Sequence, residues 1–308
     1  PRIRETAKIL WKFYILISAL EVIALMLAGM SLYDALTHTF ACMACGGFSP
    51  YNSGIEAFNS PLIEFILTLF MFAAGAHFAL YYRAIYVNKN LLFRDEEFRT
   101  YTYLLLGFTG VLTIVLYRDM EYSFFNSFRY AIFQITSIMT ATGFASIDFN
   151  LWKDSAKILV LSVMFIGGCA GSTGGGMKVV RFLLMLKYSR RELFKFIHPR
   201  LVRPVRFNNK AVPDEILQSI LSFIVLYIGV FVIAAVLLTL LGVDLLSSIT
   251  ASITTLGNIG PGFNVVGPMA NFYDLPILGK IILINNMWVG RLEVYTVLVL
   301  FTSDFWHS

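Results

Sequence analysis

The sequence has few charged residues. Asp, Glu, Lys and Arg make up 14% of its 308 residues, whereas 57% of the residues are hydrophobic. Typical soluble domains carry about a quarter of charged residues, which cover their exterior. The shortage excludes a disordered chain, a nucleic-acid-binding domain and an ordinary cytosolic domain. It indicates a membrane protein that crosses the bilayer several times.

Cysteine and histidine are also scarce, with three and four residues respectively. Three cysteines are too few for a disulfide framework. Cys42 and Cys45 form a C-x-x-C motif, but no second motif or pair of histidines accompanies it, so an apolar environment is favoured over metal or redox chemistry. An intramembrane enzyme would need converging acids or a nucleophile–base pair within the spans. We expect no enzyme activity and no cofactor.

Lysine and arginine are missing from residues 13–82 and 211–279. Most of them gather in three clusters, at residues 2–12, 83–99 and 178–210, and the last cluster holds ten. Cytoplasmic loops of membrane proteins carry such an excess of positive charge. The clusters therefore predict that both termini of this chain are cytoplasmic. Four basic residues fall on the other side by this interpretation: Arg118, Arg129, Lys153 and Lys157.

Six apolar segments approach the roughly 20 residues that a helix needs to cross a bilayer. They pair into three hairpins, which are separated by basic loops and closed by long outer connections. The predicted spans are Leu10–Met30, Pro61–Ala84, Tyr101–Tyr117, Ser155–Tyr188, Ile216–Gly242 and Leu275–Phe301.

The outer connections form an internal repeat. Each contains a short apolar segment that is typical of a helix and ends in glycine, at residues 34–48, 126–144 and 244–263. The repeat recurs at intervals of about 100 residues, which is strong support for a repeated architecture. It divides the chain into three span–pore helix–span units, 1–88, 89–188 and 216–308, with a basic cytoplasmic loop at 189–215.

A half-helix of about 12 residues cannot cross the bilayer, so it dips in and turns back. The returning backbone is tolerated at membrane depth only where protein buries it or where it lines a water-filled cavity. The C-terminal end of the half-helix carries partial negative charge, which favours a cation. Glycine allows the turn to adopt positive φ, and aligned carbonyl oxygens can replace the water shell of potassium. The alternative is that these are outer loops without function.

Residues 167–176 contain six glycines in ten positions inside the fourth predicted span. Two G-x-x-x-G spacings would suit close helix packing. So many glycines, together with Ser172 and Thr173, favour instead a break of the helix in mid-membrane. The segment is not a phosphate-binding loop, because Met177 separates the last glycine from Lys178.

Four strings resemble a known family: A-T-G-F-A-S-I-D-F-N at 141–150, I-G-G-C-A-G-S-T-G-G-G at 166–176, G-P-G at 260–262 and G-R-L-E-V at 290–294. They resemble the Trk/Ktr/HKT superfamily of potassium transporters, most closely its bacterial TrkH/TrkG branch. The resemblance extends from the first residues to Phe305-Trp306. It implies four units around a pseudo-fourfold pore, of which this chain resembles the second, third and fourth. We therefore expect the first unit upstream of Pro1, in a longer protein.

The resemblance also implies site residues. It places the potassium filter at Ala44, Cys45, Gly46, Ala141, Thr142, Gly143, Asn258, Ile259 and Gly260. It places an intramembrane gate at Gly167, Gly168, Gly171, Ser172, Thr173, Gly174, Gly175 and Gly176, and a pore arginine beside the gate at Arg291. A charge within a span is costly. The alternatives for Arg291 are snorkelling to the cytoplasmic surface or pairing with Glu293.

The resemblance implies the pore-forming subunit of a potassium uptake system in the bacterial inner membrane, with K+ as the transported ion. Its partners would be a second copy of the chain and a TrkA-like cytosolic ring of nucleotide-binding subunits. The loop from Lys187 to Pro213 would also attract anionic lipid. Transport could be coupled to protons or sodium. The alternative is a sodium-preferring or Na+/K+ transporter of the same superfamily, in which serine replaces the first filter glycine.

Overall fold

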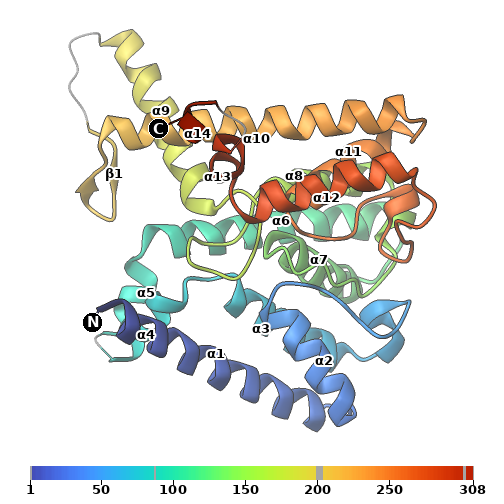
Figure 1. The fold of residues 1–308 in the computed structure, drawn as a ribbon. Coiled ribbons are helices and arrows are strands. Elements are labelled where there is room, and N and C mark those ends of the chain that lie inside the picture. Colours follow the sequence, from blue (N-terminus) through green and yellow to red (C-terminus); the bar gives the residue numbers. More distant parts are fainter. Residues whose placement is uncertain (1, 87, 199–203, 301–302, 308) are drawn as a thin grey trace.

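The structure is a computed structural model that describes residues 2–86, 88–198, 204–300 and 303–307. It is all-α, as the sequence predicts. In the described residues the only sheet is a hairpin of β1 (Arg206–Phe207) and β2 (Lys210–Ala211). Both ends of the described chain lie at the same end of the helix bundle as this hairpin (Figure 1).

The first span of each unit is one continuous helix. These helices are α1 (Arg2–Leu27), α6 (Glu96–Asp119) and α10 (Asp214–Leu240). They contain no proline, and each has an apolar stretch of at least 18 residues that is long enough to cross a bilayer. Among the described residues, these three are the helices that are long and apolar enough to cross a membrane without being combined with a neighbouring helix.

The second span of each unit is broken. The helix pairs are α3 (Pro61–Ala74) with α4 (Phe78–Tyr86), α8 (Asp154–Met164) with α9 (Val179–Ile197), and α12 (Ile277–Arg291) with α13 (Val294–Val299). Only the break between α8 and α9 is predicted by its glycines. The predicted spans at 61–84 and 275–301 are not continuous helices, because α3 and α4 meet at 90° and α12 ends at Arg291. Phe301 lies outside the described residues.

The break between α3 and α4 is held by another unit. The Gly75 carbonyl accepts a hydrogen bond from Cys169 N–H at 2.8 Å, so it is not free to continue a helix. His77 Nδ1 accepts from Ala79 N–H at 3.2 Å and thereby caps the start of α4. A β-carbon at Gly75 would lie 2.7 Å from the Tyr101 hydroxyl, so a larger residue does not fit.

The break after α12 also depends on a contact between units. Glu293 adopts φ +65°, which is unusual for a residue with a side chain. Its carboxylate pairs with Arg181 of α9 at 2.7 Å. The Arg181 guanidinium lies 3.9 Å from the centroid of the Phe223 ring on α10, and this cation–π contact orients it toward Glu293.

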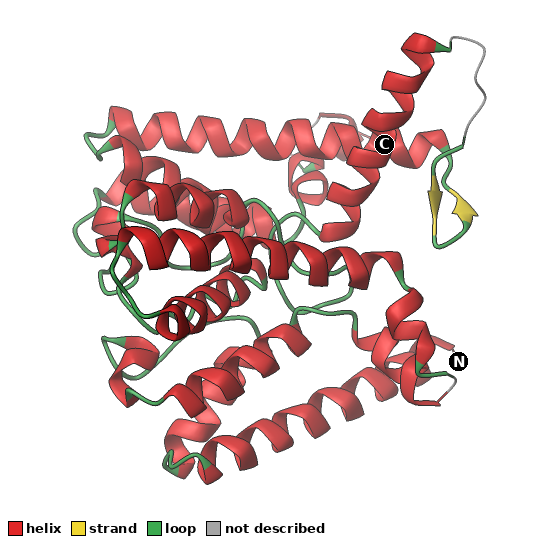
Figure 2. Ribbon diagram, turned by 180° about the vertical axis from the view of Figure 1, so that it is seen from behind, coloured by secondary structure: helices red, strands yellow, loops and turns green. Residues whose placement is uncertain are grey.

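Three short helices follow the first spans: α2 (Leu32–Met43), α7 (Phe124–Met139) and α11 (Leu245–Leu256) (Figure 1). We call them the pore helices. Ser31, Ser123 and Asp244 cap their N-termini by accepting hydrogen bonds from N–H groups of the first turn. The remaining helices are short, namely η1 (Gly54–Phe58), α5 (Asn90–Arg94), η2 (Phe149–Leu151), η3 (Asn264–Val266) and α14 (Ser303–His307). Figure 2 shows how far helices dominate the described residues.

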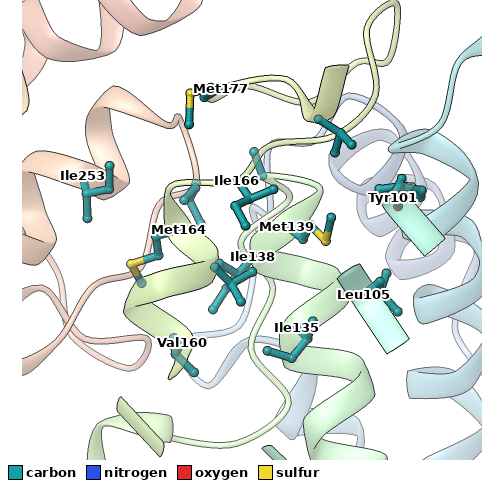
Figure 3. Packing of buried hydrophobic residues seen from close by; sticks show 14 of the residues in the cluster. Tyr101, Leu105, Ile135, Ile138, Met139, Val160, Met164, Ile166, Met177 and Ile253 are labelled. Atoms are coloured by element: carbon teal, nitrogen blue, oxygen red, sulfur yellow. The ribbon is translucent and has the colours of Figure 1, made fainter. Parts of the chain in front are cut away.

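The largest apolar cluster surrounds α7 and extends into the third unit (Figure 3). Ile138 and Met139 of α7 pack in the same cluster as Ile166 and Met177, which lie near the two ends of the break between α8 and α9. The non-helical segment between those helices is therefore anchored in the core at both ends.

The first two units are also joined by an ion pair within the membrane region. Glu64 Oε2 of α3 and Arg129 Nε of α7 lie 3.0 Å apart, although their geometry is not that of a hydrogen bond. The side chains are 4% and 18% exposed. Removing one partner from such a buried pair leaves the other charge uncompensated, which costs more than the pair contributes.

We predict that Arg129→Met lowers the free energy of unfolding by about 3–5 kcal/mol. The double variant Glu64→Gln/Arg129→Met should regain part of this loss, because no charge is then left unpaired. Thermal unfolding in detergent measures both. Arg118→Met is the matched control, since the Arg118 side chain is 84% exposed. Equal melting temperatures for Arg129→Met and the control would contradict the prediction.

Candidate ion pathway

The three pore helices end in the same unusual conformation. The residue after each C-cap has a side chain and yet adopts positive φ: Cys45 at 52°, Ala141 at 57° and Asn258 at 53°. A glycine with positive φ follows two residues later, at Gly47, Gly143 and Gly260. Non-glycine residues rarely occupy this region unless the surrounding structure holds them there. The repeat found in the sequence is therefore a repeat of backbone geometry.

This geometry moves the predicted alignment by one residue in the first unit. The N–H groups of Gly46, Thr142 and Ile259 each donate to the carbonyl five residues earlier, at 2.8, 2.9 and 2.8 Å. Gly47, not Gly46, is therefore equivalent to Gly143 and Gly260, and Ala44 is equivalent to the C-cap Thr140. The shared dipeptide in Gly47-Phe48 and Gly143-Phe144 is the sequence signal that identifies this alignment.

The glycines bring adjacent segments into backbone contact. A β-carbon at Gly47 would collide with the carbonyl oxygen of Thr142, and one at Gly143 would collide with that of Ile259. A β-carbon at Gly260 would meet nothing within 4 Å. The first segment thus contacts the second and the second contacts the third, whereas among the described residues no such neighbour meets Gly260.

Hydroxyl groups of the pore helices hold the returning backbone. Ser137 Oγ donates to the carbonyl of Phe144 at 2.6 Å, and Thr254 Oγ1 donates to that of Pro261 at 3.1 Å. In both units the hydroxyl donor lies seven residues before the carbonyl acceptor. Ala41 stands at the equivalent position of the first unit and cannot make this bond. These serine and threonine side chains replace the partners that water would supply elsewhere.

The Gly-rich loop, residues 165–178, packs against the ends of three helices. Added β-carbons at Gly168, Gly174 and Gly175 would collide with the carbonyl oxygens of Gly75, Thr140 and Gly257, which directly follow α3, α7 and α11. The segment is not helical, so its glycines do not serve helix–helix packing. They allow a loop to lie directly on the backbone beneath two of the predicted filter segments.

Thr173 connects the loop with the first and third units. Its Oγ1 lies 3.1 Å from Cys45 Sγ, and its carbonyl accepts a hydrogen bond from Arg291 Nη1 at 3.2 Å. Arg291 lines a cavity of about 290 Å³ next to the loop. Glu293 pairs with Arg181 rather than with Arg291. The structure thus brings the first predicted filter segment, the predicted gate and the predicted pore arginine together.

Lys178 is a residue of this site that the sequence predictions missed. Its ammonium group donates to the carbonyl of Gly174 and to Ser172 Oγ, the latter at 3.4 Å. It lines the same cavity as Arg181 and Arg291. A lysine two residues after a run of glycines is a usable signal, because its side chain can fold back onto the carbonyls of the loop.

Cys42 of the C-x-x-C pair lies in the last turn of α2, and Cys45 directly follows its C-cap. Cys42 and Cys45 are buried free thiols. Within the ranges that the structure covers, no three His, Cys, Asp or Glu side chains gather where they could hold a metal ion.

Comparison with known proteins identifies the family. The profile of the TrkH family, described as a cation transport protein, matches residues 1–308. The Trk system potassium uptake protein TrkH of Escherichia coli K12 is 39% identical over the whole chain. The chain belongs to the TrkH family. It is a membrane protein of a transporter family, not of an enzyme family.

Two further relatives extend the comparison. The Trk system potassium uptake protein TrkG of Escherichia coli K12 is 33% identical over the whole chain and is covered over 63% of its own length. The crystal structure of the potassium transporter TrkH from Vibrio parahaemolyticus is 37% identical and superimposes with a TM-score of 0.93. That match covers 99% of this chain and 66% of the crystallised one. The chain spans 64% of the length of TrkH from Escherichia coli.

We predict that Gly143→Ala destabilises this TrkH-family chain by about 1–3 kcal/mol, the usual cost of overpacking. The added carbon would meet the Ile259 carbonyl, and φ at Gly143 is +85°. Gly107→Ala on α6 is the control, because a β-carbon there meets nothing within 4 Å and alanine favours a helix. The measurement is thermal unfolding in detergent. Equal melting temperatures for Gly143→Ala and Gly107→Ala would contradict the backbone contact between Gly143 and Ile259.

Proposed function

We propose that the chain belongs to the pore-forming subunit of a potassium uptake system. The observation that carries the proposal is the contact of three repeated segments, each of which follows a pore helix and has the same positive-φ turn. The partial negative charge at these helix ends favours a cation. Backbone carbonyls can replace the water shell of potassium. The names of the relatives support potassium as the transported ion.

The proposed filter follows the alignment of the backbone. Its carbonyls would come from Cys45, Gly46 and Gly47 in the first unit, and from the equivalent residues of the other two: Ala141, Thr142, Gly143, Asn258, Ile259 and Gly260. The side chains differ in size and polarity, which suits a site in which backbone oxygens coordinate. The side next to Gly260 is where a fourth segment would complete the ring.

The Gly-rich loop is the proposed gate, and Arg291 is the proposed electrostatic barrier beside it. The loop lies against the residues that follow α7 and α11. Arg291 donates to its Thr173 carbonyl. A guanidinium next to a cation pathway raises the free energy of a passing cation. Movement of the loop would then open the pathway.

The remaining proposals concern the setting of the pore. The complete subunit would act as a homodimer in the bacterial inner membrane, with both termini of this chain and the β1–β2 hairpin on the cytoplasmic side. A TrkA-like ring of nucleotide-binding subunits would dock there. The basic side chains of Lys187, Arg190 and Arg206, which line one cavity at this end, favour contact with anionic lipid.

Complementation tests the function. The full-length gene should restore growth at low potassium to a bacterium that lacks its own potassium uptake systems. Proteoliposomes of the purified protein should take up rubidium more readily than sodium. A failure of growth, with the protein present in the membrane, would contradict the proposed function. Faster sodium than rubidium uptake would favour the sodium-preferring alternative.

We also predict that Arg291→Ala raises rubidium uptake of the full-length protein about tenfold, as expected when a barrier falls by one charge interaction in a partly buried site. Arg118→Ala removes the same charge from the exposed end of α6 and should leave uptake unchanged. Unchanged uptake in Arg291→Ala would remove the proposed role of this arginine.

A further inference from the structure

We propose that Glu97 is the positioning residue that holds the Gly-rich loop in its closed conformation, and that the cytoplasmic β1–β2 hairpin is connected to it through Asp95 and Glu96. The proposal rests on the proposed role of the loop as a gate. Glu97 lies in the first turn of α6 and belongs to neither the loop nor the predicted filter.

One carboxylate oxygen of Glu97 joins two different elements. Glu97 Oε1 accepts hydrogen bonds from Ala170 N–H of the loop at 2.6 Å and from Val180 N–H of α9 at 3.3 Å. The side chain is 5% exposed. Hydrogen bonds to a charged acceptor are about twice as strong as neutral ones. Glu97 therefore ties the loop to the helix that follows it.

The Val180 N–H belongs to the first turn of α9, where no helical carbonyl is available as a partner. A carboxylate at that end also suits the helix dipole. Cys169, the residue before Ala170, donates to the Gly75 carbonyl at 2.8 Å. These bonds hold the part of the loop at Cys169 and Ala170 against the end of α3 and the start of α6. The loop leaves this position only if Ala170 gives up its acceptor.

The neighbours of Glu97 face the cytoplasmic hairpin. Asp95 caps α6 by accepting from Phe98 N–H at 2.9 Å, and its second oxygen accepts from Asn208 Nδ2 at 2.8 Å. Asn208 Oδ1 in turn accepts from Glu96 N–H at 2.9 Å. Asn208 lies in the turn between β1 and β2.

A second connection runs through α9. Glu96 forms an ion pair with Lys187, which also donates to the Arg206 carbonyl in β1 at 2.8 Å. The three consecutive acidic residues Asp95, Glu96 and Glu97 thus connect the start of α6 with the hairpin, with α9 and with the Gly-rich loop. A displacement of the hairpin by a cytoplasmic partner would shift the start of α6. It would thereby move the Glu97 carboxylate, which accepts the hydrogen bond from Ala170 of the loop.

The test uses Glu97→Gln in the full-length protein. Glutamine keeps an oxygen at the same place but loses the charge, so the closed loop should be less favoured by about fivefold. Cys169 is a buried thiol next to Ala170 and reports the position of the loop. We expect about fivefold faster maleimide labelling of Cys169, located by peptide mass spectrometry, and a comparable rise in rubidium uptake.

Glu215→Gln is the matched control, because Glu215 lies exposed in the first turn of α10. It should label and transport like the wild type. Wild-type labelling of Cys169 in Glu97→Gln would overturn the proposal, as would a fall in uptake. Labelling does not depend on transport, so a wild-type protein that carries no rubidium would contradict the proposed function separately.

The connection to the hairpin is tested with Asn208→Ala. This variant should also speed Cys169 labelling, by less than Glu97→Gln does. The double variant should label more slowly than the product of the two single effects predicts, because both changes act on the same acceptor. Independent, multiplying effects of the two substitutions would overturn the connection.

Discussion

Backbone that leaves a helix inside a membrane must find its hydrogen-bond partners in the protein, and the rest of this structure depends on that constraint. The segments after the pore helices and the Gly-rich loop are both non-helical. Their N–H and C=O groups are held by serine and threonine hydroxyls and by backbone groups of neighbouring units. Glycine is required at several of these contacts because a β-carbon would occupy the place of a carbonyl oxygen.

The same constraint explains why the second spans are broken. The Gly-rich loop supplies the donor, Cys169 N–H, that ends the helical pattern at Gly75 in the first unit. The side chain of Arg181 at the start of α9 pairs with Glu293 at the break in the third unit. The middle unit therefore shapes both of its neighbours. The proposed filter segments and the proposed gate, the Gly-rich loop, would thus be held in place by the same backbone contacts between units.

Much of the fold could be predicted from local signals. Apolar length, the positions of lysine and arginine and the recurring glycines predict the spans, the pore helices and the break at residues 167–176. The break at Gly75 could not be predicted, because its cause is a carbonyl contact with Cys169, which is distant in sequence. The alignment of the first unit was wrong by one residue, since Gly46 and Gly47 are adjacent and only backbone conformation distinguishes them. Glu97 has no motif, and its role depends on two N–H groups brought together by folding.

The proposed filter requires that carbonyls of the three aligned segments bind the transported ion. Anomalous diffraction from crystals of the full-length protein grown with rubidium tests it most directly. An anomalous peak is expected between the backbone carbonyls of the aligned residues Gly46, Thr142 and Ile259. A protein that transports rubidium but shows no peak there, or binds it only at acidic side chains elsewhere, would contradict the proposed filter.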